Sequence, residues 1–229
     1  MKNIIVILLI FSVQLVSGQV KGYIGVKGGG SISNTYIEHT VYNTFLKTGF
    51  TPGYNAGMVV KLFTKTPKPS GVNGAIHTGL YLEQKGWKQV FETDEPSYHV
   101  KMNYLVLPFE GAGYIGKGKT RLFISAGIFL EQLISYQKDD TPDLENIGRG
   151  IEFYTYEEDR DKQFGYGIRA TMGLQYDSKI GAFHVDGFIS YTASSFIQTE
   201  KLSDRLPDLT NHYLGGFSVA YMIPFGNHP

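Results

Sequence analysis

The chain of 229 residues contains no cysteine, and this absence excludes several classes of protein. A disulfide-stapled scaffold and a thiolate metal site both need cysteine side chains, and so does the acylated anchor of a bacterial lipoprotein. An excess of charge is also missing, because 21 basic side chains balance 21 acidic ones. Nucleic-acid binding depends on a basic surface, so nucleic acid is not an expected partner.

Long apolar runs are missing after the first residues. The N-terminus combines Lys2 with an apolar run over residues 4–11, followed by Val16 and Gly18 at positions suited to a signal peptidase. This pattern predicts a secretory signal peptide over residues 1–18, cleaved after Gly18. The apolar run is shorter than the roughly 20 residues that a spanning helix needs. We therefore expect one mature domain over residues 19–229.

Glycine and aromatic side chains are abundant, with 28 Gly, 16 Tyr and 15 Phe. They fall into segments that alternate with period two, which is typical of β-strands. In the clearest segment, residues 164–176, the even positions are apolar from Phe164 to Tyr176 and the odd ones include Arg169. Seven further segments alternate in the same way, although the facing of residues 98–114 is ambiguous: residues 21–28, 54–62, 76–85, 98–114, 121–131, 181–191 and 213–225.

The character of the two faces indicates where the strands lie. One face is apolar with aromatic residues near the strand ends, and the other is mostly Gly, Ser, Thr, Asn and Gln with isolated charges. A polar lumen, aromatic girdles and alternating long and short connections are typical of outer membrane barrels. The sequence therefore predicts an all-β fold, an eight-stranded antiparallel up-and-down transmembrane β-barrel in the outer membrane, with the membrane's lipids as partners.

Two alternatives remain open. A soluble periplasmic or secreted barrel of the lipocalin type would bind an apolar ligand, and it requires the apolar face of residues 164–176 to point inward. A small pore is the other alternative, although eight strands leave little open lumen.

The middle of the chain resembles the PorT-like outer membrane β-barrel family of Bacteroidota. The resemblance is carried by two runs, residues 80–88 and residues 103–114, and its motif positions are Tyr81, Lys85, Gly86, Tyr104, Leu105, Leu107 and Pro108. It implies a barrel in the outer membrane, and it implies partners in the envelope or in a secretion complex. The chain departs from the family pattern at Val106 and at Pro224, which we expect to break the last strand.

Eight ionisable side chains fall on the inward parity of the expected strands. We predict that they form a network of lumen charges, namely Lys27, Lys61, Glu83, Arg121, Glu131, Arg169, His184 and Asp186. Such residues either line a path for ions or pair with one another to fill the barrel. Pairing is the favoured interpretation, because an unpaired buried charge costs about 3–5 kcal/mol.

Four other features invite a function. His184 and Asp186 with Ser125 or Ser190 resemble hydrolase components, but they point away from lipid, so we predict that the chain is not an enzyme. The acidic residues 137–162 offer oxygen ligands for calcium, but their spacing matches no EF-hand loop, so we expect a solvated surface loop and no metal. Trp87 is expected at the membrane interface or on a stacking surface for a sugar or partner. The Gly-rich residues 26–31 lack a phosphate-loop spacing, so no cofactor is expected.

These observations together predict a non-enzymatic outer membrane barrel. Its extracellular loops would serve binding or adhesion, or they would support the envelope or a secretion system.

Overall fold

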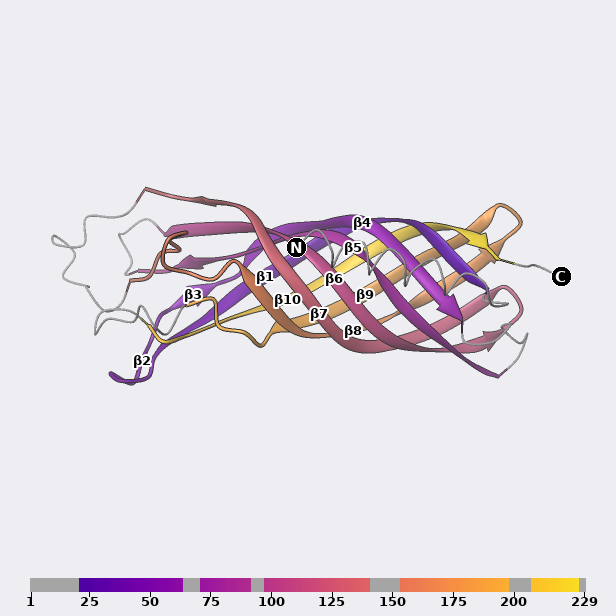
Figure 1. The fold of residues 1–229 in the computed structure, drawn as a ribbon, viewed down its shortest axis with the longest axis horizontal. Coiled ribbons are helices and arrows are strands. Elements are labelled where there is room, and N and C mark those ends of the chain that lie inside the picture. The colour runs from indigo at the N-terminus through magenta and orange to yellow at the C-terminus, as the bar shows by residue number, and fades with distance from the viewer. Residues whose placement is uncertain (1–20, 64–70, 92–96, 141–152, 198–206, 227–229) are drawn as a thin grey trace, which may run out of the picture.

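The structure is a computed structural model of the chain, and it describes residues 21–63, 71–91, 97–140, 153–197 and 207–226. Eight long strands and two strands of two residues each lie within these ranges (Figure 1): β1 (Gly22–His39), β2 (Thr44–Phe45), β3 (Thr48–Gly49), β4 (Thr51–Phe63), β5 (Val72–Gln89), β6 (Tyr98–Lys117), β7 (Thr120–Lys138), β8 (Phe164–Ser178), β9 (Gly181–Thr192) and β10 (Leu209–Phe225). No helix in the described part of the chain is long and apolar enough to cross a membrane.

The long strands form a single closed antiparallel ring. Each pairs with its neighbours in the chain, and β10 returns to pair with β1 from Gly22 opposite Phe225 to Glu38 opposite Leu209. Closure leaves the spanning part of the sheet without a free edge, which is the condition for a β-sheet to cross a bilayer. The predicted all-β, up-and-down antiparallel barrel is confirmed.

The apolar face of the alternating segments points outward. Ile168 and Met172 on β8 are 59% and 58% exposed, whereas Arg169 between them is 3% exposed. The same alternation runs along β9, where Val185 and Ile189 face outward and Asp186 faces inward. The lipocalin-like alternative required the opposite facing and is therefore wrong.

Two rows of aromatic side chains border the outward apolar surface. Tyr176, Phe183 and Tyr221 lie opposite one another on β8, β9 and β10 near one end. Tyr191 and Tyr213 lie opposite each other toward the other end. On β8, Tyr176 lies ten positions after Tyr166. In a tilted strand this distance corresponds to roughly 25 Å along the barrel axis, which is the height of an apolar membrane band.

The two ends of the barrel differ in their connections. At the short-turn end, β6 and β7 are joined by Gly118 and Lys119, and β8 and β9 by Lys179 and Ile180. Gly118 has a φ of 70°, a left-handed conformation that glycine adopts without strain. At the other end, the long-loop end, the strands extend further and carry β2 and β3 (Figure 1).

Several strands are longer than predicted, and the last is not broken. β1 continues to His39 and β7 to Lys138, beyond the ends expected from alternation. These extensions lie past the outward apolar band, where no hydrocarbon requires the outer face to be apolar. The prediction that Pro224 breaks the last strand is wrong, because Pro224 stays within β10 opposite Tyr23. It lies next to the strand's end, where a missing amide donor removes a single ladder bond.

Candidate functional site

The barrel interior holds a layer of charged side chains at mid-height. Arg169 on β8 donates to Glu83 on β5, and its Nε lies 3.6 Å from a carboxylate oxygen of Glu110 on β6. At least 95% of each of these side chains is buried. One guanidinium thus lies against two carboxylates, and it also stacks 3.8 Å from the ring centre of Phe188.

A second layer joins β9 to β1 and β4. Asp186 lies 4.0 Å from the Lys27 ammonium and accepts a 2.7 Å hydrogen bond from Ser218. The Lys61 Nζ lies 3.1 Å from Nε2 of His184. Because an ammonium has only donors, Nε2 is the acceptor, and the protonated Nδ1 faces Asp186 at 3.5 Å.

The remaining charges lie nearer the two ends of the lumen. Toward the long-loop end, Lys85 donates to Glu131, which also accepts a 3.1 Å hydrogen bond from Thr192. At the short-turn end, Arg121 donates to Asp177. The structure thus places all eight expected lumen residues inside the barrel, with direct contacts to ionisable or polar partners.

Three charged members of these layers were not anticipated. Lys85 shares the inward parity of Glu83, so the alternation of β5 could have identified it. Glu110 lies on β6, whose facing was ambiguous because its middle is apolar on both parities. Asp177 lies next to the turn after β8, where alternation carries no information.

The components of the considered hydrolase do not assemble. Ser125 donates its hydroxyl hydrogen bond to Glu110, and Ser190 has no hydrogen-bond partner among the described residues. Nε2 of His184, the nitrogen that would activate a serine, faces Lys61. The lumen charges are therefore arranged as ion pairs rather than as a nucleophile with its base.

The long-loop end of the lumen is closed by an aromatic group, called here the mouth cluster, of Trp87, Tyr154, Phe196 and His212. Trp87 is fully buried and stacks on Phe196 and Tyr154, with ring centres 5.7 and 6.1 Å apart. His212 lies 5.0 Å from Phe196 and accepts or donates a 2.7 Å hydrogen bond with Thr35. Both interpretations of Trp87, at the interface or on an exposed stacking surface, are wrong.

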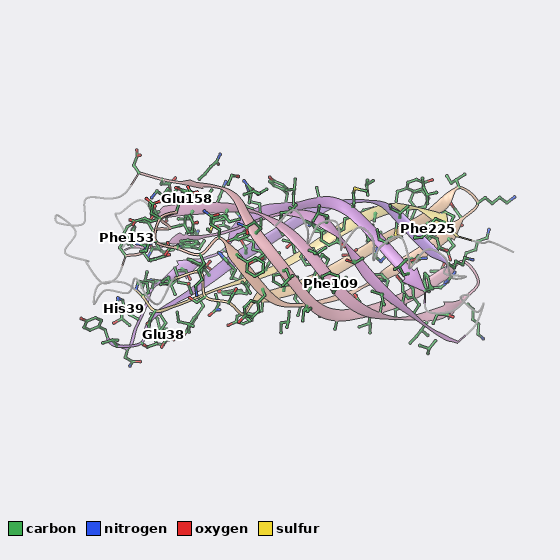
Figure 2. The ribbon with its side chains drawn as sticks, in the orientation of Figure 1. Glu38, His39, Phe109, Phe153, Glu158 and Phe225 are labelled. Carbon is green, nitrogen blue, oxygen red and sulfur yellow. The ribbon has the colours of Figure 1, made fainter. Side chains whose placement is uncertain are left out.

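The chain segment 153–163, called here the mouth strap, supplies Tyr154 to this cluster. The Tyr154 hydroxyl donates to Asp161 at 2.7 Å, and Arg160 pairs with the same carboxylate at 2.8 Å. Burial raises the pKa of Tyr154 well above its usual value. Only part of the described acidic segment is therefore solvated: Asp139, Asp140 and Glu158 are exposed, whereas Tyr154 and Asp161 are buried in the mouth. Figure 2 labels Phe153 and Glu158 of the strap at this end of the barrel.

The acidic segment shows no metal site in the part that is described. Within the described ranges, no three histidine or acidic side chains converge as metal ligands. Asp143, Glu145 and Glu152 of the same segment lie outside those ranges, as does the predicted signal peptide.

A hairpin held by hydrogen bonds projects beyond the mouth, and residues 40–45 are called here the hairpin tip. The turn is closed by Asn43 at a φ of 50° and by a hydrogen bond from its amide to the Thr40 carbonyl. Thr40 is held by Asp208 through both its amide and its hydroxyl. The tip exposes Val41, Tyr42 and Phe45, by 79%, 47% and 55%.

The family of the chain follows from its sequence together with this closed ring. Residues 20–196 match the family model of the outer membrane protein beta-barrel domain. The chain belongs to this family. This outer membrane barrel therefore lies in the membrane whose apolar band its outward face fits. A search of curated proteins finds no match.

The outer membrane barrel is also similar to solved structures, at identities that show the fold alone. The attachment invasion locus protein Ail of Yersinia pestis, in complex with a heparin analogue, is 11% identical over 88% of this chain and 99% of that one, with a TM-score of 0.39. The outer membrane enzyme PagL is 13% identical over 85% and 99%, with a TM-score of 0.34. The protease OmpT of Escherichia coli is 8% identical over 91% and 96%, with a TM-score of 0.37.

Two of these matches correct an expectation. The prediction that the chain is not an enzyme is wrong as an exclusion, because barrels of this architecture include the enzyme PagL and the protease OmpT.

Proposed function

We propose that this protein is a PorT-like outer membrane barrel that binds a partner at its long-loop end, in adhesion or in an envelope or secretion complex. The proposal includes export by the signal peptide of residues 1–18, cleavage after Gly18, and a mature barrel over residues 19–229. Long loops face outward in outer membrane barrels, so the long-loop end would face the cell exterior. Membrane lipids would contact the outward apolar surface between the two rows of aromatic side chains.

The observation that carries this proposal is the hairpin tip. An apolar surface normally stays out of water, yet here a hairpin fixed by Asp208 presents Val41, Tyr42 and Phe45 beyond the aromatic rows. A rigid apolar protrusion loses little conformational entropy on binding, and aromatic anchors are enriched among residues that dominate interfaces. The tip therefore has the properties of a partner-binding surface.

The closed lumen supports binding over passage. The mouth cluster covers one end, and the layers around Arg169 and Lys61 fill the middle. Because side chains occupy the interior, other molecules can contact the long-loop end only at its rim, which is formed by the strand extensions and the loops around the mouth.

The motif shared with the PorT-like family has a structural role in this rim. Gly86 on β5 has its amide and carbonyl bonded to the Ser33 hydroxyl, at 2.8 and 3.1 Å. A Cβ atom at Gly86 would lie 2.2 Å from the Val100 carbonyl oxygen. Glycine at this position lets β1, β5 and β6 approach closely below the mouth.

A photo-crosslinking residue at position 42 tests the proposal in intact cells. We expect Tyr42 replaced by a benzophenone amino acid to give a discrete crosslinked adduct, and the same replacement of Ile180, on a short turn, to give a different product or none. The variant V41S/Y42S/F45S should weaken the affinity of the cell-surface binding that the adduct reports by about tenfold or more, because each anchor contributes roughly 1–3 kcal/mol.

The experiment has a clear negative outcome. If position 42 gives no adduct while the barrel is folded, as judged by a mobility shift on heating, the binding proposal fails. The mass of the purified protein checks the export step separately, since cleavage after Gly18 leaves Gln19 as the first residue.

A further inference from the structure

The short-turn end of the barrel opens into a cavity of about 320 Å³, called here the basic vestibule. It is lined by the turn between β6 and β7 and by the neighbouring ends of the strands, with side chains that include Lys21, Tyr23, Lys119, Arg121, Asp177 and Pro224. Tyr23, Arg121 and Asp177 belong to the lumen side of the wall, where Tyr23 and Arg121 both donate hydrogen bonds to the Asp177 carboxylate. The vestibule therefore opens along the barrel axis and not toward the surrounding lipid.

Arg121 at the vestibule has unused hydrogen-bonding capacity. Its Nη2 donates to Asp177, but its Nη1 is buried without a hydrogen-bond partner among the described residues. Leaving a buried charged donor unsatisfied is costly, so such a group calls for a partner such as a water molecule or an anion. The ligand that completes a guanidinium is an anionic oxygen.

The charge of the cavity lining also favours an anionic ligand. Lys21, Lys119 and Arg121 give three positive charges against the one negative charge of Asp177, so the lining carries 3 − 1 = +2. Two more exposed lysines, Lys117 and Lys179, stand on or beside the short turns. The positive surface is thus wider than the cavity.

The opposite end of the barrel carries the opposite charge. Among the described residues, five exposed acidic side chains there outnumber three exposed lysines, the acids being Asp139, Asp140, Glu157, Glu158 and Asp159 and the lysines Lys47, Lys138 and Lys162. The zero net charge of the chain therefore conceals a separation between an acidic long-loop end and a basic short-turn end.

We propose that the basic vestibule binds an acidic segment of a periplasmic protein, with one carboxylate on Arg121 and others on the surrounding lysines. A protein segment fits better than a lipid phosphate, because the vestibule faces the barrel axis. It also fits better than a single inorganic anion, because Lys117 and Lys179 extend the positive surface beyond the cavity. The inference concerns the end of the barrel opposite the hairpin tip and goes beyond the binding proposed there.

The test uses the full mature chain in micelles of a zwitterionic detergent and a fluorescently labelled hexaglutamate peptide at low salt. We expect the peptide to bind, and the variant K21Q/K119Q to bind about tenfold more weakly, since exposed ion pairs contribute up to ~1 kcal/mol each and tenfold is 1.4 kcal/mol. The matched control K47Q/K162Q removes two exposed charges at the long-loop end and should change binding less than twofold.

The variant R121Q distinguishes binding of the peptide in the vestibule from general electrostatic attraction of the peptide to the lysines. It should also weaken binding, provided that it keeps the mobility shift of a folded barrel. Equal weakening by K21Q/K119Q and K47Q/K162Q would overturn the proposal, as would no binding by the unaltered protein. Binding of inorganic phosphate that hexaglutamate does not displace would identify a small-anion site and also overturn it.

Discussion

Arg169 is the residue on which the middle of the lumen depends. It is the cation that lies against both Glu83 and Glu110, and it does so in a layer closed to water. Its guanidinium can serve two carboxylates at once because its donors lie in a planar fork, which a lysine does not offer. Phe188 against its face adds a contact that a smaller cation would lose.

Replacing Arg169 with Gln should destabilise the barrel by about 3–5 kcal/mol, because two buried carboxylates lose their cation. Urea unfolding in micelles measures the change in the free energy of unfolding. The double variant E83Q/R169Q should lose less free energy of unfolding than E83Q and R169Q lose together, since it also removes one of the carboxylates that R169Q leaves unpaired. The control K162Q, at an exposed side chain, should stay within ~0.5 kcal/mol; a comparably small loss for R169Q would contradict the ion-pair layer.

At the scale of elements, the mouth strap is the least expected part of the molecule. Its sequence is acidic and reads as a surface loop, yet Phe153, Tyr154 and Tyr156 are buried. Asp161 shows how an acidic segment can be partly buried, because its buried carboxylate has Arg160 and the Tyr154 hydroxyl as partners. The acidic character of the strap is partly neutralised inside the mouth.

The strap should loosen in alkali. Burial raises the folded-state pKa of Tyr154, so the neutral phenol stabilises the closed mouth fully below the ordinary tyrosine pKa of about 10. This stabilisation is lost as the pH rises through the raised pKa. Fluorescence of Trp87, the one tryptophan, should report the change. In Y154F the response of this phenol should disappear; identical alkaline transitions in both proteins would contradict the assignment.

How far the sequence predicts these elements depends on what surrounds them. Within the membrane band, hydrocarbon outside and a polar lumen inside impose strict alternation, and the facing of Ile168 and Arg169 was predictable. Beyond the band, both faces of a strand meet mixed surroundings, so the extension of β1 to His39 left no signal. The place of Trp87 depends on Tyr154 and Phe196, which come from loops distant in sequence, and no local pattern encodes that meeting.

The molecule as a whole is a filled cylinder with two different ends. Ion-pair layers occupy its middle, an aromatic cluster covers one end, and a shallow basic cavity opens the other. An eight-stranded barrel has an interior just wide enough for side chains, and here large ones such as Trp87, Tyr114 and Lys61 occupy it. The geometry favours contacts at the ends over transport through the centre.

We expect no discrete channel openings when the purified protein is added to planar lipid bilayers. The variant W87A/F196A should remain silent as well, because the layers around Arg169 and Lys61 lie beneath the mouth cluster and still fill the lumen. A porin added to the same bilayer provides the positive control. Stepwise, reproducible conductance of the unaltered protein would contradict the filled lumen.

The seam between β1 and β10 also determines how the protein must be made. Gly22, at the start of the first strand, pairs with Leu62 of β4 on one side, but its partner on the other side is Phe225, at the end of the last strand. The ring thus closes only after nearly the whole chain has been synthesised and has crossed the periplasm. Until then β1 and the growing chain end both carry unpaired edges, and contacts so distant in sequence form slowly. Survival of the unfinished barrel during that interval therefore depends on chaperones that cover strand edges.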